Sequence, residues 1–324
     1  MAKRKKLTSK TTELPELFKE RLKLILQPTD LIMTLSSFSK ERNTTLRVNT
    51  LKTDAPTVQK WLQQHGIPFV RHNLLEFAFV LPKTTSREAT EWDIYKEGKI
   101  YLQNLSSMIP PLILNPQPGE SILDLTAAPG SKTTQMAAMM QAKGKLTAND
   151  KNYPRYKRLE ANVAMQVGGD FVKIHNLPGE VFGKQYAEQF DRVLIDAPCS
   201  SEGQFSLLQP KTLHYWTRHK IKEMVFKQNK LLYSAIHACK PGGLVVYSTC
   251  TFAPEENEMV VSKMLKKFEG QIKLEPIELK LPNVRPGITK WNDKELDPTV
   301  KMALRVIPTQ EFEGFFVAKI RKLG

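Results

Sequence analysis

From about residue 98 onward, apolar positions alternate between short continuous runs and longer segments with helical spacing. The runs predict buried strands at 121–127, 144–150, 170–176, 192–198 and 242–249. Apolar residues recurring every three or four positions predict helices at 132–142, 153–166, 222–239 and 255–268. Strands that are apolar on both faces and joined by helices indicate a parallel sheet covered on both sides. We therefore expect an α/β fold.

The two ends of the chain follow other patterns. Apolar spacing predicts helices at 14–26 and 55–66, and extended segments at 44–53, 67–72 and 76–82. This favours a small α+β domain over 11–97, after a basic tail at 1–10 that we expect to be disordered. Near the C-terminus, 302–308 and 314–322 predict a hairpin that raises the sheet to seven, mostly parallel strands. The larger domain then covers 98–324.

The net charge of the 324-residue chain is +15, which favours a polyanionic partner such as nucleic acid. Charge alone does not separate RNA from DNA or from an anionic membrane, and a basic surface can also serve solubility. No apolar stretch reaches the roughly 18 residues of a membrane span, and no apolar segment follows the basic N-terminus. We therefore expect a cytoplasmic protein with neither membrane span nor secretory leader.

The chain has three cysteines, at 199, 239 and 250, too few for a disulfide framework. No Cys/His group has zinc spacing, so we expect no metal. Cys239 lies among apolar residues of a predicted helix, which indicates a core position. Cys199 and Cys250 instead follow the fourth and fifth predicted strands, and ligands of open α/β sheets bind at such strand ends.

Asp196, Cys199 and Cys250 form a set suited to one reaction. A cysteine thiolate can add to carbon 6 of a pyrimidine, which lets carbon 5 accept a methyl group from S-adenosylmethionine. An acid such as Asp196 can balance the charge at the Watson–Crick edge of the base, and a second thiol can help the product leave. The residues alone leave open which cysteine attacks.

Two other strand ends carry ligand-binding candidates. Asp124 ends the first strand, and the small residues after it open a helix whose backbone amides could face a ligand, although an ordinary strand-to-helix turn looks the same. Asp150 ends the second strand, where an acid in nucleotide-binding folds accepts hydrogen bonds from ribose hydroxyls. The alternative for Asp150 is a helix N-cap.

Three stretches resemble the Sun family of RNA (cytosine-5)-methyltransferases, which includes the Nop-type proteins. They are "DLTAAPGSKTTQMA" (124–137), "DAPCSSEG" (196–203) and "YSTCTFAPEENE" (247–258). "LRVNTLK" (46–52), "YLQNLSSMIPPLIL" (101–114) and "EGFFVAKIRK" (313–322) are also similar to that family. The resemblance covers the chain from about residue 40 to its end and is strongest to the bacterial branch that modifies small-subunit ribosomal RNA. It implies a Rossmann-like methyltransferase domain.

The resemblance also implies roles for single residues. Cys250 matches the family's nucleophile, Cys199 the cysteine that assists product release, and Asp196 the acid that contacts the target cytosine beside the cofactor. Asp150 would hold the ribose of S-adenosylmethionine. Lys132 would either fix the catalytic loop or be a solvated lysine. The cofactor cradle would comprise Ala127, Ala128, Pro129, Gly130, Ser131, Lys132 and Thr133.

The sequence departs from the family pattern at two places. Ser131 stands where many members have glycine. The third strand is followed by "HNLPGEVFG" (175–183), with Pro178 near the position of an acid that faces the adenine. We expect a backbone group, Asn176 or Glu180 to take over that contact. The family's C-terminal RNA-binding domain, present in some members, is not expected here.

The leading hypothesis is a monomeric RNA cytosine-5 methyltransferase acting on ribosomal RNA, with transfer RNA as the alternative substrate. A DNA cytosine-5 methyltransferase would place its attacking cysteine after the proline of the fourth-strand motif. A catalytically silent RNA-binding or assembly factor is favoured only by the altered 175–183 stretch. The small domain, including Arg47, and the basic segment 211–230 are candidates for phosphate contacts. Tyr215 and Trp216 could stack on a base or pack inside the protein.

Overall fold

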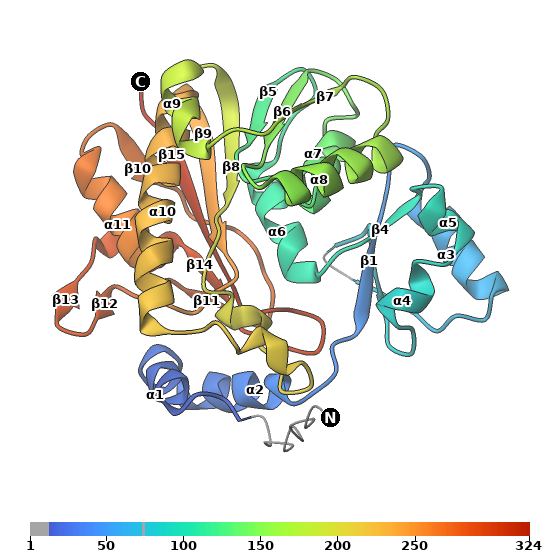
Figure 1. Ribbon diagram of the computed structural model, residues 1–324, viewed down its shortest axis with the longest axis horizontal. Coiled ribbons are helices and arrows are strands. Elements are labelled where there is room, and N and C mark those ends of the chain that lie inside the picture. The colour runs from blue at the N-terminus through green and yellow to red at the C-terminus, as the bar shows by residue number, and fades with distance from the viewer. Residues whose placement is uncertain (1–12, 73–74) are drawn as a thin grey trace, which may run out of the picture.

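Two sheets organise the described part of the chain, which comprises residues 13–72 and 75–324 of the computed structural model (Figure 1). The smaller sheet lies at the right of Figure 1 and the larger one at the left and centre. The basic tail expected at 1–10 lies outside the described residues. Within the described ranges, no helix has the length and apolar character to cross a membrane.

The small sheet is antiparallel, with strand order β2-β3-β1-β4. Leu46 and Phe79 of this sheet pack with Val58 and Leu62, which share one helix face because they lie four residues apart. β4 lies past residue 97, so the small sheet extends beyond the boundary expected there. The elements are β1 (Thr44–Val48), α3 (Ala55–Gln64), β2 (Val70–Arg71), β3 (Ala78–Leu81), α4 (Ser86–Ala89), α5 (Asp93–Lys96) and β4 (Ile100–Leu102).

Two N-terminal helices, α1 (Glu16–Ile25) and α2 (Pro28–Phe38), pack beneath the large domain (Figure 1). Phe18 and Phe38 share an apolar cluster with Phe205 and Phe252, which follow the strands that end at the two cysteine motifs. The ring centroids of Phe18 and Phe205 are 4.9 Å apart. The segment expected as one domain over 11–97 therefore has two parts, and only the part from β1 onward builds the small sheet.

The large sheet has the order β11-β14-β15-β9-β8-β5-β6-β7, with β10 paired to β15. β9, β8, β5, β6 and β7 are parallel, and the predicted C-terminal hairpin adds β14 and β15 in the antiparallel sense. The strands are β5 (Ser121–Asp124), β6 (Lys145–Asn149), β7 (Val172–His175), β8 (Phe190–Asp196), β9 (Cys239–Thr249), β10 (Ile272–Leu274), β11 (Val284–Pro286), β14 (Leu304–Val306) and β15 (Phe315–Lys322).

The described residues thus form a nine-stranded sheet, and the expected count of seven is wrong. The two extra strands, β10 and β11, have three residues each, which is too short to give a periodic pattern. Cys239 is the first residue of β9 rather than the end of a helix, and it is completely buried as expected. β12 (Lys290–Trp291) and β13 (Lys294–Glu295) form a separate small hairpin.

Different helices cover the two faces of the large sheet. One face packs against α6 (Leu105–Leu114), α7 (Ser131–Met139) and α8 (Tyr153–Gln166), and the other against α9 (Phe182–Gln185), α10 (Arg218–Ala238) and α11 (Glu258–Lys267). α6 was not predicted, because Pro110 and Pro111 stand inside it and proline disfavours helix interiors. Burial of Met108, Ile109 and Leu114 in the core offsets that cost. Short 3-10 turns lie at Gly179–Val181, Glu202–Gln204, Pro210–Thr212 and Pro298–Met302.

Candidate active site

The carboxyl ends of β5, β6, β8 and β9 open into a pocket of about 670 Å³. Asp124 and the turn after β5 form one wall, Asp150 another, and the two cysteine motifs a third. The predicted site residues that line the pocket are Ala127, Ala128, Pro129, Ser131, Lys132, Asp150, Asp196, Cys199 and Cys250. Gly130 and Thr133 were expected in the cofactor cradle but do not line it.

The turn after β5 is held in place by α8. The Ala128–Pro129 peptide is cis, and the carbonyl oxygens of these two residues accept hydrogen bonds from Arg155 and Asn162. Gly130 has φ +107°, a left-handed conformation that glycine adopts without strain, and α7 begins directly after it. Gly130 therefore shapes the turn and does not need to contact a ligand.

Asp124 is buried beneath this turn. The Thr133 hydroxyl donates a hydrogen bond to its Oδ2 at 2.6 Å, which explains why Thr133 points away from the pocket. Oδ1 of Asp124 is buried with no hydrogen-bond partner among the described residues. Burial raises the pKa of Asp124 to about 7. Asp124 is therefore a buried, partly protonated carboxyl beneath the turn.

Asp150 presents its carboxylate to the pocket rather than to a helix end. Its Oδ1 accepts a hydrogen bond from the Asn152 backbone at 2.9 Å, and Arg155 pairs with Oδ2 at 3.5 Å. Asn152 is the N-cap of α8, since its side chain accepts from the Arg155 backbone. The helix-cap interpretation of Asp150 is therefore wrong.

The stretch after β7 approaches the pocket through its backbone. Gly179 lines the pocket, whereas the side chains of Asn176 and Glu180 do not. The Asn176 amide instead donates a hydrogen bond to the Asp150 carbonyl at 2.7 Å. Of these residues of the 175–183 stretch, Gly179 is the one that lines the pocket.

Lys132 and Asp196 form an ion pair inside the pocket, with Nζ and Oδ2 2.6 Å apart. Lys132 is only 6% exposed, and its ammonium also donates to Ser107 Oγ at 2.8 Å. Ser248 donates to the other carboxylate oxygen, Oδ1, at 3.0 Å. Interpreting Lys132 as a solvated lysine is therefore wrong, because this side chain fixes the orientation of Asp196.

Cys199 and Cys250 face each other in the pocket, with their sulfur atoms 3.1 Å apart and no disulfide between them. Ser201 Oγ lies 3.7 Å from the Cys250 sulfur. The hydrogen bond with Cys250, followed by burial, raises the pKa of Cys199 well above that of an ordinary thiol. Either sulfur can act as the donor in this contact.

The comparisons with known proteins identify the family. The model of the 16S rRNA methyltransferase RsmB/F family matches residues 111–321. This chain belongs to the RsmB/F family.

Several relatives of this RsmB/F member are known. The ribosomal RNA small subunit methyltransferase F of Vibrio campbellii is 35% identical over 96% of this chain and 63% of its own length. The tRNA (cytosine(49)-C(5))-methyltransferase of Pyrococcus abyssi is 42% identical over 70% of this chain and 72% of its own. A methyltransferase homolog from Pyrococcus horikoshii has a solved structure with a TM-score of 0.82, 34% identity and 95% coverage of both chains.

The RsmB/F assignment confirms the predicted Sun/Nop-type family, its Rossmann-like methyltransferase fold and S-adenosylmethionine as the family's methyl donor. The chain spans about 63% of the length of the Vibrio relative. The activity and substrate of this chain are therefore treated below as proposals.

Two buried glutamates behind the cysteines were missed from the sequence. Glu256 accepts hydrogen bonds from the Ser200 backbone at 3.0 Å and from Gln228 at 2.8 Å, and it also bonds the Ser200 hydroxyl. Glu202 accepts from the Thr251 hydroxyl at 2.9 Å. The Ser200 and Thr251 hydroxyls are 2.7 Å apart, so the network ties the Cys199 loop to the Cys250 loop of this RsmB/F member.

Burial raises the pKa of the Glu202 and Glu256 carboxyls. The pKa of Glu256 rises to about 8, and the charge of Glu202 is the second cause of that rise. Both glutamates stand in the cysteine motifs, next to Ser201 and Glu255. Charged residues are usually exposed, so the motif pattern alone did not mark these two as buried.

The two aromatic residues of the 211–230 segment have different environments. Trp216 packs against Phe18 and donates its indole N–H to Glu202 at 2.7 Å. The packing interpretation therefore holds for Trp216, which supports the glutamate network. Tyr215 is 82% exposed and stays a candidate for stacking on RNA.

Proposed function

We propose that this chain transfers a methyl group from S-adenosylmethionine to carbon 5 of a cytosine in RNA, with Cys250 as the nucleophile. The observation that carries the proposal is the meeting of Cys250, Cys199 and the Lys132–Asp196 pair in one pocket. Family membership supports the reaction class. The DNA methyltransferase alternative lacks such support.

The pocket has the chemistry to hold S-adenosylmethionine. Its walls present the carboxylates of Asp150 and Asp196, which complement a ligand with ammonium and sulfonium charges. We propose that Asp150 accepts hydrogen bonds from the ribose hydroxyls. Ala127 to Pro129 and Gly179 allow close approach of the backbone. When bound, S-adenosylmethionine supplies the methyl group to carbon 5.

The thiol pair supports a division of roles. The two sulfur atoms are 3.1 Å apart and either can donate, and we propose that the Cys199 S–H donates when Cys250 attacks as the thiolate. That thiolate attacks carbon 6, forming an S–C bond while the ring takes up the electron pair. Asp196, oriented by Lys132 and Ser248, contacts the Watson–Crick edge as hydrogen-bond partner or general acid.

Release follows from the same pair. Once Cys250 is bonded to carbon 6, it no longer shares a proton with Cys199, and the Cys199 thiol releases its proton to water. The Cys199 thiolate can then accept the proton from carbon 5. The electron pair of that C–H bond restores the ring double bond and expels Cys250 as a thiolate. Loss of Cys199 therefore stops the cycle at the covalent stage.

A polar groove leads out of the pocket and supports RNA as the substrate. It has a volume of about 1050 Å³, runs between the small sheet and the large domain, and shares Gln103, Asn104, Gln204 and Glu313 with the pocket. Lys40 and Lys83 line it. Chemistry on a base requires an unstacked nucleotide, and such a groove can hold its flanking strand.

Arg47, expected as a phosphate contact, is instead completely buried. Its guanidinium donates to Gln103 at 2.8 Å and Thr134 at 2.9 Å. Its structural role is to join the small sheet to α7, which carries Lys132. The relatives favour different RNAs. The Vibrio relative supports ribosomal RNA as our first choice, and the Pyrococcus abyssi relative supports transfer RNA as the second.

The test supplies S-adenosylmethionine with a labelled methyl group and transcripts of small-subunit ribosomal RNA and transfer RNA. The proposal predicts label in 5-methylcytosine from the wild-type protein and none from Cys250→Ala. Label in another nucleoside, or full activity of Cys250→Ala, would refute it. Binding of S-adenosylhomocysteine without transfer to either RNA would favour the silent assembly factor.

A further inference from the structure

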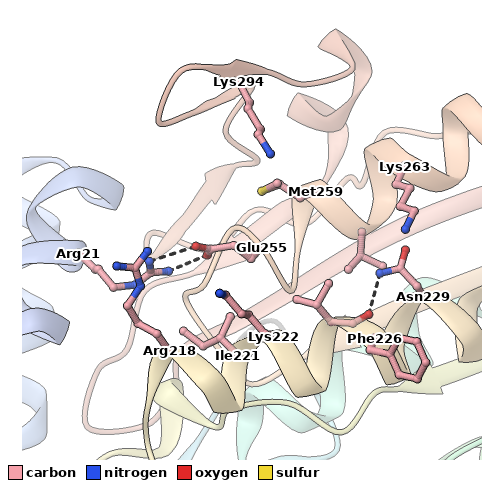
Figure 2. A pocket seen from close by; sticks show the side chains of 12 residues that line it. Arg21, Arg218, Ile221, Lys222, Phe226, Asn229, Glu255, Met259, Lys263 and Lys294 are labelled. Atoms are coloured by element: carbon pink, nitrogen blue, oxygen red, sulfur yellow. Dashed lines mark hydrogen bonds and ion pairs between the residues drawn. The ribbon is translucent and has the colours of Figure 1, made fainter.

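A second pocket, of about 550 Å³, is lined in part by residues of α10 (Figure 2). Lys220, Met224, Lys227 and Leu231 of α10 face the catalytic pocket. At 3.6 residues per turn, the α10 residues of the second pocket lie on the other helix face. The pocket, called here the α10–α11 pocket, is lined by Arg21, Arg218, Ile221, Lys222, Val225, Phe226, Asn229, Glu255, Met259, Val260, Lys263 and Lys294.

The floor of the α10–α11 pocket is apolar. Ile221 and Val260 are buried in it, and Phe226 stands at its edge with 63% of its surface exposed. Asn229 donates to the Val225 carbonyl at 2.7 Å, while its Oδ1 has no hydrogen-bond partner among the described residues. Lys230 Nζ lies 4.2 Å from the centre of the Phe226 ring, and the rest of this exposed ring beside the apolar floor can accommodate a heteroaromatic base.

The rim of the α10–α11 pocket is cationic. Arg21 is paired with Glu255 through contacts of 2.6 and 3.1 Å, as Figure 2 shows at one end of the pocket. The other four rim cations have no ion pair among the described residues. In Figure 2 the ammonium groups of Lys263 and Lys294 are directed toward the pocket. The remaining two, Arg218 and Lys222, come from α10.

These positions are not explained by helix stability. The first turn of α10 contains no acid and begins with Arg218, although the positive end of a helix dipole disfavours cations there. The four unpaired cations are exposed, so water screens their mutual repulsion, but their common sign around an apolar floor attracts an anionic ligand. Segment 1–12 of the chain is also basic and has no acidic residue. Charge repulsion therefore argues against this segment as the occupant of the pocket.

We propose that the α10–α11 pocket binds an unpaired nucleotide of the substrate RNA that lies outside the target cytosine. Its base would rest on the apolar floor near Phe226, and the flanking phosphates would contact Lys222 and Lys263. The inference rests on the proposed function, since the same RNA occupies the catalytic pocket across α10. RNA bound at both faces of α10 would hold the target strand in a defined register.

The test compares two fluorescein-labelled single-stranded RNAs, of 5 and 15 nucleotides, each with one central cytosine. The double variant Lys222→Ala/Lys263→Ala is expected to lower affinity for the longer RNA about tenfold and to reduce the slope of log K against log salt by about 1.4. Affinity for the short RNA stays unchanged. Phe226→Ala lowers affinity for the longer RNA severalfold without changing the slope, because stacking is uncharged.

The matched control is Lys143→Ala/Lys145→Ala, which removes two exposed lysines near the amino end of β6, at the opposite edge of the sheet. The proposal is overturned if the test variant behaves like this control, or if it loses affinity for both RNAs equally. A concentration-dependent dimer that the test variant abolishes, with RNA binding unchanged, would assign the pocket to a second copy and overturn it too. Failure of the proposed function is separate, because it would appear as absent methyl transfer by the wild-type protein.

Discussion

Replacing Glu256 with glutamine tests the buried network behind the two cysteines. The pKa of this carboxyl is about 8 in the folded protein against an ordinary 4.5, chiefly because it is buried. A folded-state pKa above the unfolded one means that the folded protein holds the proton more tightly, so stability falls as pH rises between the two values. A glutamine amide is neutral at every pH and keeps one oxygen and one donor group.

The magnitude follows from these two pKa values. As the pH rises from about 6 to 8, Glu256 alone should lower the free energy of unfolding of the wild-type protein by about 2 kcal/mol. Glu256→Gln should lack this contribution, so its stability relative to wild type should rise by that amount over the same range. Glu256→Ala differs, because the Ser200 N–H, the Ser200 hydroxyl and the Gln228 amide all lose their acceptor. Leaving these buried donors unsatisfied should lower the free energy of unfolding by about 3 kcal/mol or more.

The assay is urea unfolding at the two pH values, followed by tryptophan fluorescence. The control is Glu278→Gln, at an exposed position, which should track the wild-type pH dependence. If Glu256→Gln also tracks the wild type, Glu256 is not protonated in the folded protein and the reasoning fails. A drop in its stability at pH 6 comparable to that of the alanine variant would likewise contradict the neutral-carboxyl account.

Three further predictions address the cofactor side of the pocket. Asp150→Asn should weaken S-adenosylhomocysteine binding about tenfold by calorimetry, because a charge-assisted acceptor is lost, and an unchanged affinity would exclude the ribose contact. Lys132→Met should lower the rate of methyl transfer about 100-fold, because Asp196 loses the ion pair that orients it. The affinity for S-adenosylhomocysteine should stay within about threefold of wild type, and equal losses in rate and affinity would contradict an orienting role. Gly130→Ala should cost about 1–2 kcal/mol in thermal unfolding because of its positive φ, and a neutral effect would show that the turn relaxes.

The periodic parts of the fold were predictable from the sequence. Buried parallel strands carry continuous apolar runs, so β5 to β9 and the order of elements were found, and the C-terminal hairpin followed from its alternation. α6 and α2 were missed, because two prolines in α6 and polar residues in α2 obscure the helical pattern that tertiary burial then stabilises.

The site residues that directly follow a predicted strand could be found from the sequence. Cys199, Cys250, Asp196 and Asp150 all reach the pocket because parallel strands end at one edge of the sheet. The sequence could not place Glu256, since burial of a carboxylate depends on partners that come together only in the folded chain. That Gly179 rather than Asn176 lines the pocket depends on backbone direction, which spacing does not specify.

Trapping the covalent intermediate tests the central claim most directly. Cys199→Ala, incubated with RNA and S-adenosylmethionine carrying a labelled methyl group, is analysed on a denaturing gel. The account predicts a shifted protein–RNA band that contains the label and disappears in Cys199→Ala/Cys250→Ala. A band that survives in the double variant, or a band formed by Cys250→Ala instead of Cys199→Ala, would contradict Cys250 as the nucleophile and Cys199 as the residue that releases the product.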